Sequence, residues 1–543
     1  MSRRLIEKAD ALLKKERGTV LKDPGGKVNI CLVYPNTYFV GMSNLGFQGI
    51  YTLLNERVDT VCERAFLPDP KDMQEFERTG TELFSMESKR PLGRFDIVAF
   101  SVSFENDYPN ILKLLALSKI PFRQSERKPS HPLLVMGGVC AFSNPEPFAE
   151  FFDICFIGEG EEMLNEFIDE YKRAGTKDKL LRNCLHIEGL YVPSLYEVSN
   201  EPLKRTALEG APKTIKKRFV SDISGFKPSI ITPETEFSNM YLIEAMRGCP
   251  WKCRFCLAGH VYSPLRKKLL SVIKQEISDA LKLTERVGLI APSLMDYPYI
   301  EDVLKTEGVN FSITSLRASP KSIRLIALLR GKSISIAPEA GTERLRNVIN
   351  KRLKEEEIIE TSRHALLHGI ERLKLYFMVG LPTEKDEDID GIIGLVKKIR
   401  ESPTKGEVTL SVSTFVPKPF TPFQWHPMEK EDVVKRRLSM IKRALIPIKG
   451  VRVFHDVLKY AYMQGMFSMA DRRVSNVLIK MLEVSDWQKA SYNSGIKPDF
   501  YIFRKKDFTE PLPWDFIDTG ISKEELWKEY QKAVSELTFH IKM

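Results

Sequence analysis

The sequence predicts an α/β protein with two sheet domains and a smaller helical region, and three observations support this expectation. The N-terminal part alternates short, continuously apolar segments with amphipathic helical ones, which is the pattern of a parallel sheet covered by helices on both faces. A second series of such alternations begins near residue 240, and a charged helical pattern follows residue 427. We therefore expect a Rossmann-like (flavodoxin-like) domain, a partial (β/α)6 barrel and a small α-rich C-terminal domain.

The elements are expected in a fixed order along the chain. The predicted units are an N-terminal helix in residues 1–26, the Rossmann-like domain in 27–199, a polar linker in 200–236, the barrel in 237–427 and the α-rich domain in 428–543. The first domain is expected to hold the strands VNICLVY, FDIVAFSVS, PLLVMGG and FDICFIGEGE. The barrel is expected to hold the strands YLIEAM, RVGLIAP, VNFSITSL, GKSISIAPEAG, RLKLYFMVGLP and EVTLSVSTFVP.

Composition and apolar patterning point to a cytoplasmic protein. Of its 543 residues, 43% are hydrophobic and 28% are charged, as is usual for globular proteins. The longest charge-free stretch, from Val28 to Asn55, is interrupted by Pro35, Gly41 and Gly46, so it does not read as a membrane span. The first residues lack the apolar core of a signal peptide.

The net charge leaves two interpretations open. Basic residues outnumber acidic ones by 82 to 72, which gives +10, with clusters at Lys213–Arg218, Arg266–Lys268 and Lys435–Arg443. A solvated surface is the simpler interpretation, and an RNA or another anionic substrate is the alternative. No aromatic-interleaved RNA-binding motif accompanies the clusters, so we favour the first.

Three of the eight cysteines form a compact motif. Residues 247–260 read RGCPWKCRFCLAGH, which places Cys249, Cys253 and Cys256 in a Cys-x3-Cys-x2-Cys pattern. Cuboidal 4Fe–4S clusters are usually held by four thiolates, so three thiolates leave one iron open to another ligand. With His260 the loop could instead form a Cys3His zinc site. The other five cysteines, which are scattered among apolar neighbours, are expected to be ordinary buried thiols.

The cysteine loop resembles the signature of the radical S-adenosylmethionine (SAM) superfamily. Four later segments resemble successive parts of that family's barrel: FSITSLRA, IAPEAGTERLRNVINK, LKLYFMVGLPTEKDEDI and FVPKPFTPFQW. The resemblance implies a 4Fe–4S cluster on the three cysteines, with SAM chelating the open iron and yielding a 5′-deoxyadenosyl radical. It also implies an electron donor such as flavodoxin or ferredoxin.

The same resemblance assigns candidate SAM contacts. Ser315 and Arg317 would meet the carboxylate, Glu339 the ribose or the amino group, and the backbone of Val379 and Gly380 the adenine. Many family members hold the amino group with a Gly-Gly-Glu motif after the second strand. Here that position reads LIAPSLMDYP, and Ser293 or Asp296 is the expected substitute.

The N-terminal domain resembles the cobalamin-binding domain of one large radical SAM class. The matching segments are YPNTYFVGMSNLG, AFSVSFEND, VMGGVCAFSNPEPFAEF and FIGEGEE. The resemblance implies that cobalamin contacts Ser103, Gly137, Gly138, Gly158 and Glu159. No Asp-x-His-x-x-Gly motif is present, as is common in this class.

Together the resemblances imply a cobalamin-dependent radical SAM methylase acting on an unactivated carbon. One alternative is a radical rearrangement or cyclisation without methyl transfer, and another is a zinc- or cluster-bearing, RNA-associated binding module. The C-terminal segment resembles an uncharacterised radical SAM family and leaves the substrate open: a small molecule, an RNA or a peptide. Asp471, Arg472 and Arg473 could line a cavity mouth there, although a salt bridge at a helix end is the simpler interpretation.

Overall fold

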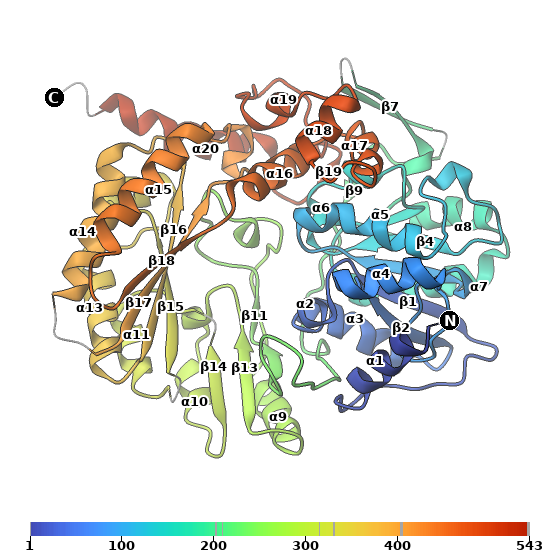
Figure 1. The fold of residues 1–543 in the computed structure, drawn as a ribbon, viewed down its shortest axis with the longest axis horizontal. Coiled ribbons are helices and arrows are strands. Elements are labelled where there is room, and N and C mark those ends of the chain that lie inside the picture. Colours follow the sequence, from blue (N-terminus) through green and yellow to red (C-terminus); the bar gives the residue numbers. More distant parts are fainter. Residues whose placement is uncertain are drawn as a thin grey trace.

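A computed structural model describes residues 2–200, 203–208, 210–313, 315–329, 332–401 and 405–539. Two lobes lie side by side (Figure 1). The N-terminal lobe carries one sheet, the central lobe carries a second, larger sheet system, and C-terminal helices bridge the two lobes along one side. This arrangement confirms the predicted fold class.

The N-terminal sheet has the strand order β2-β1-β3-β4-β5-β6, with β6 antiparallel to β5 and all other pairs parallel. This is the order of flavodoxin-like folds, in which ligands bind at the carboxyl ends of the strands, where the order reverses beside β1. The strands are β1 (Val28–Tyr34), β2 (Thr60–Phe66), β3 (Ile97–Ser101), β4 (Leu133–Gly137), β5 (Ile154–Phe156) and β6 (Leu190–Tyr191). The main helices are α1 (Arg3–Leu13), α2 (Tyr38–Met42), α3 (Leu45–Glu56), α4 (Pro70–Thr79), α5 (Tyr108–Leu117), α6 (Val139–Ser143), α7 (Gly160–Ala174) and α8 (Lys177–Asn183).

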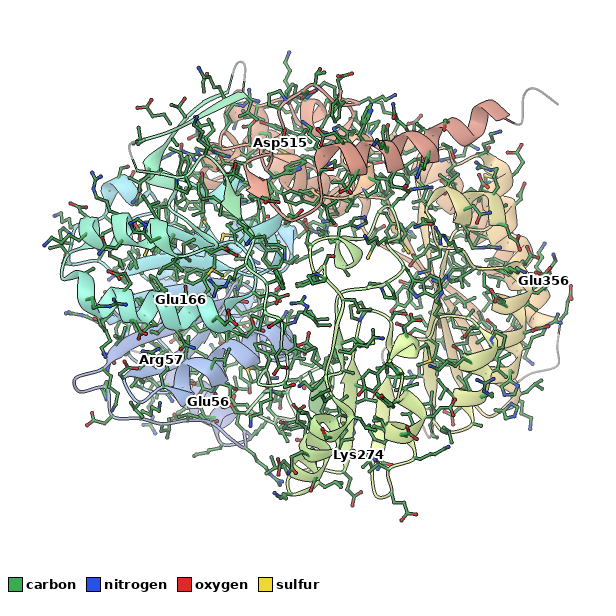
Figure 2. The ribbon with its side chains drawn as sticks, turned by 180° about the vertical axis from the view of Figure 1, so that it is seen from behind. Glu56, Arg57, Glu166, Lys274, Glu356 and Asp515 are labelled. Carbon is green, nitrogen blue, oxygen red and sulfur yellow. The ribbon has the colours of Figure 1, made fainter. Side chains whose placement is uncertain are left out.

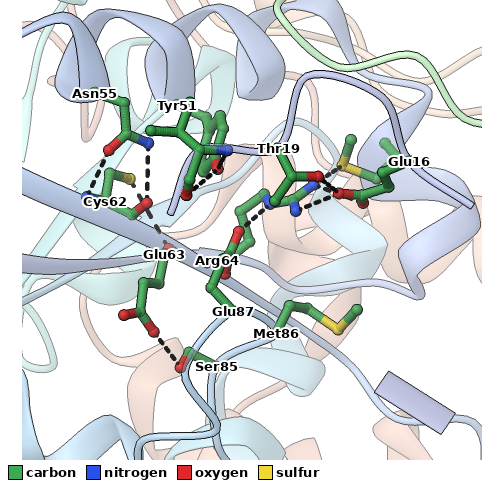
Figure 3. Close-up of polar contacts among 12 residues, drawn as sticks. Glu16, Thr19, Tyr51, Asn55, Cys62, Glu63, Arg64, Ser85, Met86 and Glu87 are labelled. Atoms are coloured by element: carbon green, nitrogen blue, oxygen red, sulfur yellow. Dashed lines mark hydrogen bonds and ion pairs between the residues drawn. The ribbon is translucent and has the colours of Figure 1, made fainter. Parts of the chain in front are cut away.

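Strand β2 is absent from the sequence prediction because two charged residues interrupt its apolar pattern. The structure buries both of them with partners. Arg64 is fully buried and forms ion pairs of 2.7 Å with Glu16 and 2.7 Å with Glu87 (Figure 3). Glu63 accepts hydrogen bonds from the hydroxyl groups of Ser85 and Ser88. An edge strand of mixed polarity can therefore be fully buried when each of its charges is paired.

We expect Arg64→Met to destabilise the N-terminal lobe by about 3–5 kcal/mol, because two carboxylates would be left buried without their cation. Urea unfolding followed by circular dichroism measures this loss. The control is Arg3→Met, since Arg3 is exposed and its one ion-pair partner among the described residues is Glu7 on the same helix, and its cost should stay below about 0.5 kcal/mol. Equal losses in both variants would contradict the buried ion pairs.

The central lobe contains two parallel sheets, β10-β13-β14 and β15-β16-β17-β18, which a parallel bridge between Leu316 and Ile336 connects. Their strands are β10 (Tyr241–Glu244), β13 (Arg286–Ile290), β14 (Asn310–Ile313), β15 (Ser333–Glu339), β16 (Arg372–Val379), β17 (Glu407–Thr414) and β18 (Val451–His455). All six predicted barrel strands are present. A further strand, β18, lies beyond residue 427 and pairs with β17. It was not predicted, because its apolar pattern is short and follows the charged helix α15 (Glu431–Leu445).

The covering helices lie on the outside of the open barrel. They are α9 (Leu270–Leu281), α10 (Ile300–Leu304), α11 (Pro320–Ile326), α12 (Glu343–Val348), α13 (Glu355–Leu367) and α14 (Asp386–Arg400), besides α15. Their polar faces point outward, as Lys274 on α9 and Glu356 on α13 show (Figure 2). The apolar faces pack on the sheet and close the core.

The C-terminal region is mainly helical and ties the lobes together. Its helices are α16 (Leu458–Met469), α17 (Val474–Lys480), α18 (Trp487–Asn493), α19 (Pro498–Ile502) and α20 (Lys523–Phe539). The linker contributes β7 (Tyr196–Asn200), β8 (Leu203–Ala207) and β9 (Ile215–Lys216), and β9 pairs in parallel with β19 (Ile517–Asp518). None of the helices in the described ranges is long and apolar enough to cross a membrane.

Candidate functional site

The cysteine loop lies at the carboxyl ends of the barrel strands. It is closed at its base by an antiparallel pair, β11 (Met246–Arg247) and β12 (Arg266–Lys267). Gly248 has φ +84°, and a Cβ at that position would lie 2.6 Å from the carbonyl oxygen of Tyr262, so the turn requires glycine. The loop is therefore held where the strands β13 to β17 also end.

The three cysteines share a partly buried environment. Cys253 is buried, whereas Cys249 and Cys256 are half-buried. Burial raises the pKa of all three thiols, and hydrogen bonds from the backbone N–H groups of Ala258 and Gly259 oppose this rise at Cys256. Backbone N–H groups aimed at a sulfur favour its thiolate form, which is the form that binds iron. The other five cysteines are buried, as expected.

The geometry gives the zinc alternative no direct support. His260 is buried, and its Nδ1 lies 2.8 Å from the carbonyl oxygen of Cys256. Within the described ranges, no three histidine, cysteine, aspartate or glutamate side chains gather around one point as a single metal ion requires. A zinc ion draws its sulfur ligands to about 2.3 Å, whereas a cluster accepts each thiolate on a separate iron atom. Three thiolates on one loop without a fourth donor fit the cluster.

Trp251 joins the cysteine loop to two strand ends. Its Nε1 donates a 2.6 Å hydrogen bond to Asp296, which follows β13 and also accepts a 2.6 Å bond from Ser293. The guanidinium of Arg317, which follows β14, stacks at 3.5 Å from the centre of the indole ring. Arg317 also donates to the backbone carbonyl groups of Lys351 and Arg352. Asp296 and Arg317 thus hold the loop in place.

The cysteine loop is also fixed to α12 and α20 through Arg254, a contact that the sequence did not indicate. Its guanidinium donates to the Val348 carbonyl oxygen at 2.8 Å and forms a 3.0 Å ion pair with Glu529 of α20. Its backbone N–H donates to the Ile349 carbonyl oxygen at 3.0 Å. Arg254 is 7% exposed, so its contacts with α12 are shielded from solvent, whereas its partner Glu529 is partly exposed.

Glu339 and Lys351 form a half-buried ion pair beside the cysteines, with 3.1 Å between Oε1 and Nζ. Glu339 ends β15 at a register shift and has φ +69°, which is rare for a residue with a side chain. Burial raises the pKa of Glu339, and the Lys351 ammonium opposes that rise. The charge of Lys351 also lowers the pKa of Cys253, against the larger effect of burial. These residues lie at the carboxyl ends of the barrel strands, an edge called the rim below. One cation and one carboxylate at this rim suit a zwitterion such as SAM.

The remaining SAM candidates lie at the same rim. Ser315 follows β14, Val379 ends β16, and Gly380 follows that strand. The carbonyl oxygen of Val379 accepts from Phe415, and the N–H of Gly380 donates to Glu384 at 2.7 Å. The structure therefore brings every predicted SAM residue to one edge, although their contacts with SAM stay predictions. Lys351 belongs to a segment that resembles the family and could have been identified there.

The N-terminal lobe presents a mixed polar and apolar edge at the carboxyl ends of β1 and β3. Asn44 Nδ2 lies 3.3 Å from the Ser103 hydroxyl. Phe39 and Val40 of α2, the helix after β1, are 45% and 39% exposed, and Phe104, which follows β3, is 43% exposed. Exposed apolar groups at the point where the strand order reverses fit the broad face of a corrin ring.

The glycines of this lobe have two different environments. Gly138, next to Gly137 at the end of β4, has φ +95°, and a Cβ there would lie 2.5 Å from the Val102 carbonyl oxygen. Gly158, after β5, is bridged to Arg218 of the linker. Glu159 is tied to Arg266 at 2.6 Å and to Arg247 at 3.1 Å. The linker therefore covers Gly158, and Glu159 joins the lobes, so the cobalamin contacts assigned to these two residues stay predictions without further support.

Asp107, which lies beside this edge, is a buried acid that lowers the stability of the folded protein at neutral pH. It is 4% exposed and accepts a 2.7 Å hydrogen bond from Asn36. Burial raises its pKa to about 6, and the nearby charge of Glu105 adds to this rise. The folded state thus retains a proton that the unfolded state releases, so the free energy of unfolding falls as the pH rises from about 4 to about 6.

We expect Asp107→Asn to stabilise the protein by about 2–3 kcal/mol at neutral pH, because the amide removes the cost of burying the charge. The difference between variant and wild type should shrink as the pH falls and vanish by about pH 3, below both pKa values, where Asp107 is protonated in the folded and unfolded states. Thermal unfolding across this pH range measures the effect. A gain that is independent of pH would contradict the titration of Asp107.

The two lobes meet at the edges that carry these candidate residues. Phe142, which follows β4, packs edge-on against Tyr262 of the cysteine loop at 5.6 Å between ring centres. Glu105, which follows β3, pairs with Lys418, which follows β17, and accepts a 2.8 Å hydrogen bond from Gln464 of α16. The carboxyl edges of both sheets therefore adjoin.

The Asp471–Arg473 segment is structural, as the simpler interpretation predicts. Arg472 pairs with Glu146 of the N-terminal lobe at 3.2 Å and donates to the Tyr191 hydroxyl at 2.9 Å. Arg473 pairs with Asp471 at 2.7 Å. These ion pairs fix α17 to the first lobe.

Comparisons with known proteins agree with this architecture. The family described as "Radical SAM superfamily" matches residues 243–396, and the family described as "Radical SAM proteins, N-terminal" matches residues 46–193. The uncharacterized protein MJ0966 of Methanocaldococcus jannaschii is 30% identical over 456 residues, which cover 83% of this chain and 90% of that protein.

Two solved structures share the overall fold. The radical SAM methyltransferase TsrM from Kitasatospora setae, with tryptophan substrate and a SAM analog bound, superimposes with a TM-score of 0.51 and 11% identity, covering 95% of this chain and all of that one. The cobalamin-dependent SAM radical enzyme OxsB, with aqua-cobalamin bound, gives a TM-score of 0.51 and 13% identity, covering 95% of this chain and 80% of that one.

Proposed function

Because this chain belongs to the radical SAM superfamily, we propose that it is a cobalamin-dependent methylase that adds a methyl group to an unactivated carbon. The observation that carries the proposal is the meeting of the two carboxyl edges. The segment between β11 and β12, which carries the cysteine motif, touches helix α6 after β4 through Tyr262 and Phe142, so a cofactor on each edge would adjoin the other. The shared fold of TsrM and OxsB supports the same arrangement.

Each group of residues has a distinct task in this proposal. Cys249, Cys253 and Cys256 would hold the cluster, and Lys351 and Glu339 would orient the charged end of SAM. Asp296 and Arg317 keep Trp251, and with it the cysteine loop, in position. When bound, the cluster, SAM and cobalamin would supply a radical that removes a hydrogen atom and a methyl group that replaces it.

The apolar edge of the N-terminal lobe would bind the corrin and keep water away from it. Phe39, Val40 and Phe104 offer apolar surface, and the neighbouring Ser103 offers a hydrogen-bonding group. An enclosed site matters because a carbon radical left open to its surroundings takes a hydrogen atom from thiols or other donors before it can accept the methyl group.

The experiment is anaerobic reconstitution with iron, sulfide, cobalamin and a flavodoxin- or ferredoxin-type reductant, followed by incubation of a metabolite extract with methyl-deuterated SAM. The proposal predicts a product that carries the deuterated methyl group, and its loss when cobalamin is omitted. A product with an unchanged carbon count would instead support a radical rearrangement or cyclisation.

A further inference from the structure

Two exposed cations lie on the cysteine loop and directly beside it. Lys252 belongs to the cysteine motif, and Arg352 follows Lys351 in the segment after α12. Both side chains are exposed, and within the described ranges neither is paired with a carboxylate. The Nε atom of Arg352 donates a 2.7 Å hydrogen bond to the neutral amide oxygen of Asn350. Lys252 and Arg352 together are called the basic patch below.

A left-handed backbone holds the basic patch in place. The φ angle is +47° at Lys252, +57° at Asn350 and +50° at Arg352, a region that costs free energy for residues with a side chain. Asn350 joins the two segments, because its Nδ2 donates to the carbonyl oxygens of Trp251 at 3.2 Å and of Lys252 at 3.0 Å. Such strained residues persist where their surroundings determine them, and they gather at functional sites.

The basic patch lies next to the groups that would hold and surround the cluster. Lys252 immediately precedes Cys253, and consecutive Cα atoms are about 3.8 Å apart. Lys351 pairs with Glu339 at the rim, whereas the next residue, Arg352, is exposed to solvent. A partner that contacts the basic patch would therefore lie only a few residues from the cluster thiolates.

The charge of this surface is positive. Glu529 of α20, which also reaches the cysteine loop, is already paired with Arg254 at 3.0 Å and with Lys532 at 2.6 Å. Arg317 donates to the carbonyl oxygen of Arg352 at 3.1 Å and so brings a further positive charge to the same segment. An excess of positive charge that faces solvent attracts an acidic partner and orients it during the encounter.

The chemistry of the cysteine loop requires an electron from another molecule. Cleavage of SAM to a 5′-deoxyadenosyl radical consumes one electron, and amino-acid side chains do not supply it. Flavodoxins and ferredoxins, the proteins that carry single electrons of low potential, have strongly acidic surfaces. Their charge complements that of the basic patch.

We propose that Lys252 and Arg352 form the docking surface for an acidic one-electron carrier protein of the flavodoxin or ferredoxin class. In the complex the carrier loses one electron and the cluster gains one, while no covalent bond forms or breaks. The proposal goes beyond methyl transfer and does not depend on it, since a cluster that cleaves SAM must first be reduced whatever the later steps are.

The kinetic test compares a protein reductant with a chemical one. Formation of 5′-deoxyadenosine is measured with reduced flavodoxin, with reduced ferredoxin and with dithionite, for the reconstituted wild type and for the double variant Lys252→Glu/Arg352→Glu. We expect the KM for the carrier to rise at least about tenfold, because four units of charge are reversed at the docking surface, and the dithionite-driven rate to stay within about twofold.

The matched control is Lys274→Glu/Lys397→Glu, which makes the same change in net charge on the outward faces of α9 and α14 (Figure 2). It should leave the KM for the carrier within about twofold. Lys252→Gln/Arg352→Gln replaces the charge-reversed variant if that variant does not hold its cluster, and its KM should rise about threefold or more. Higher salt should raise the wild-type KM and remove the difference between wild type and variants.

Cross-linking gives a readout that does not need activity. A carbodiimide joins lysine amines to carboxyl groups in direct contact, so peptide mass spectrometry should find Lys252 of the wild type linked to a carboxyl group of flavodoxin or ferredoxin. The link should disappear at about 0.5 M salt, where charges are screened beyond a few ångströms. Lys274 should form no such link.

Four results would overturn the docking surface. Equal losses with the carriers and with dithionite would show that the substitutions disturb the cluster itself. An unchanged KM, or an equal rise in the control variant, would place docking elsewhere, and a wild type that dithionite reduces but neither carrier reduces would have no partner of this class. Failure of the proposed methylation looks different, since 5′-deoxyadenosine would then form without a methylated product.

Discussion

Cys253→Ala is expected to remove the iron–sulfur cluster and reduce formation of 5′-deoxyadenosine to background. Two thiolates cannot hold a cuboidal cluster with one open iron, and Cys253 is the most buried of the three. Iron and sulfide per chain, together with the absorbance of the reconstituted protein, measure the loss. The effect on SAM cleavage is all-or-none, because no other residue can take over the role of the cluster.

The control for this variant is Cys184→Ala, which removes a buried thiol from the end of α8. It should keep full iron content and lose at most about 1–2 kcal/mol of stability through the small cavity. Full iron content in Cys253→Ala would contradict the assignment of the cysteine loop.

Arg254→Met has the second largest expected effect. It would leave the buried carbonyl oxygen of Val348 without its donor and would remove one of the two partners of Glu529, which also pairs with Lys532. We expect a loss of about 3 kcal/mol in stability and incomplete cluster assembly, because the cysteine loop would no longer be fixed to α12 and α20. Thermal unfolding and iron analysis on the same sample measure both effects.

Glu529→Gln tests the ion pair between Arg254 and Glu529 separately from the hydrogen bonds between Arg254 and the α12 carbonyl groups. Glu529 is 38% exposed and retains an amide acceptor in the variant, so the expected loss is within about 1 kcal/mol and the iron content should stay full. If Glu529→Gln lost as much iron as Arg254→Met, the bonds from Arg254 to the α12 carbonyl groups would not be what fixes the loop.

Much of the fold could be predicted because long apolar strands dominate it. Strand β1 is apolar except for Asn29, and β16 ends in the apolar run of residues 375–379; both strands are observed. Strand β2 could not be predicted because Glu63 and Arg64 look exposed until their partners are known. The partner Glu16 lies far away in the sequence, and no local pattern connects it with Arg64.

The residues of the candidate site could be predicted from the sequence, but most of the contacts between them could not. The spacing of the cysteines identifies the loop, and the family resemblance locates Arg317 and Glu339 at the same rim. The sequence alone could not show that Arg317 stacks on Trp251, that Lys351 pairs with Glu339, or that Glu159 joins the lobes. Such contacts depend on how distant strand ends meet in space, and local patterns carry no information about them.

The most direct test of the account is the yield of 5′-deoxyadenosine from the anaerobically reconstituted protein, with SAM and a low-potential reductant, measured by mass spectrometry. The account predicts 5′-deoxyadenosine from wild type, dependent on the reductant, and none from Cys253→Ala. A wild-type protein that carries its full cluster and binds SAM, yet never forms 5′-deoxyadenosine, would contradict it.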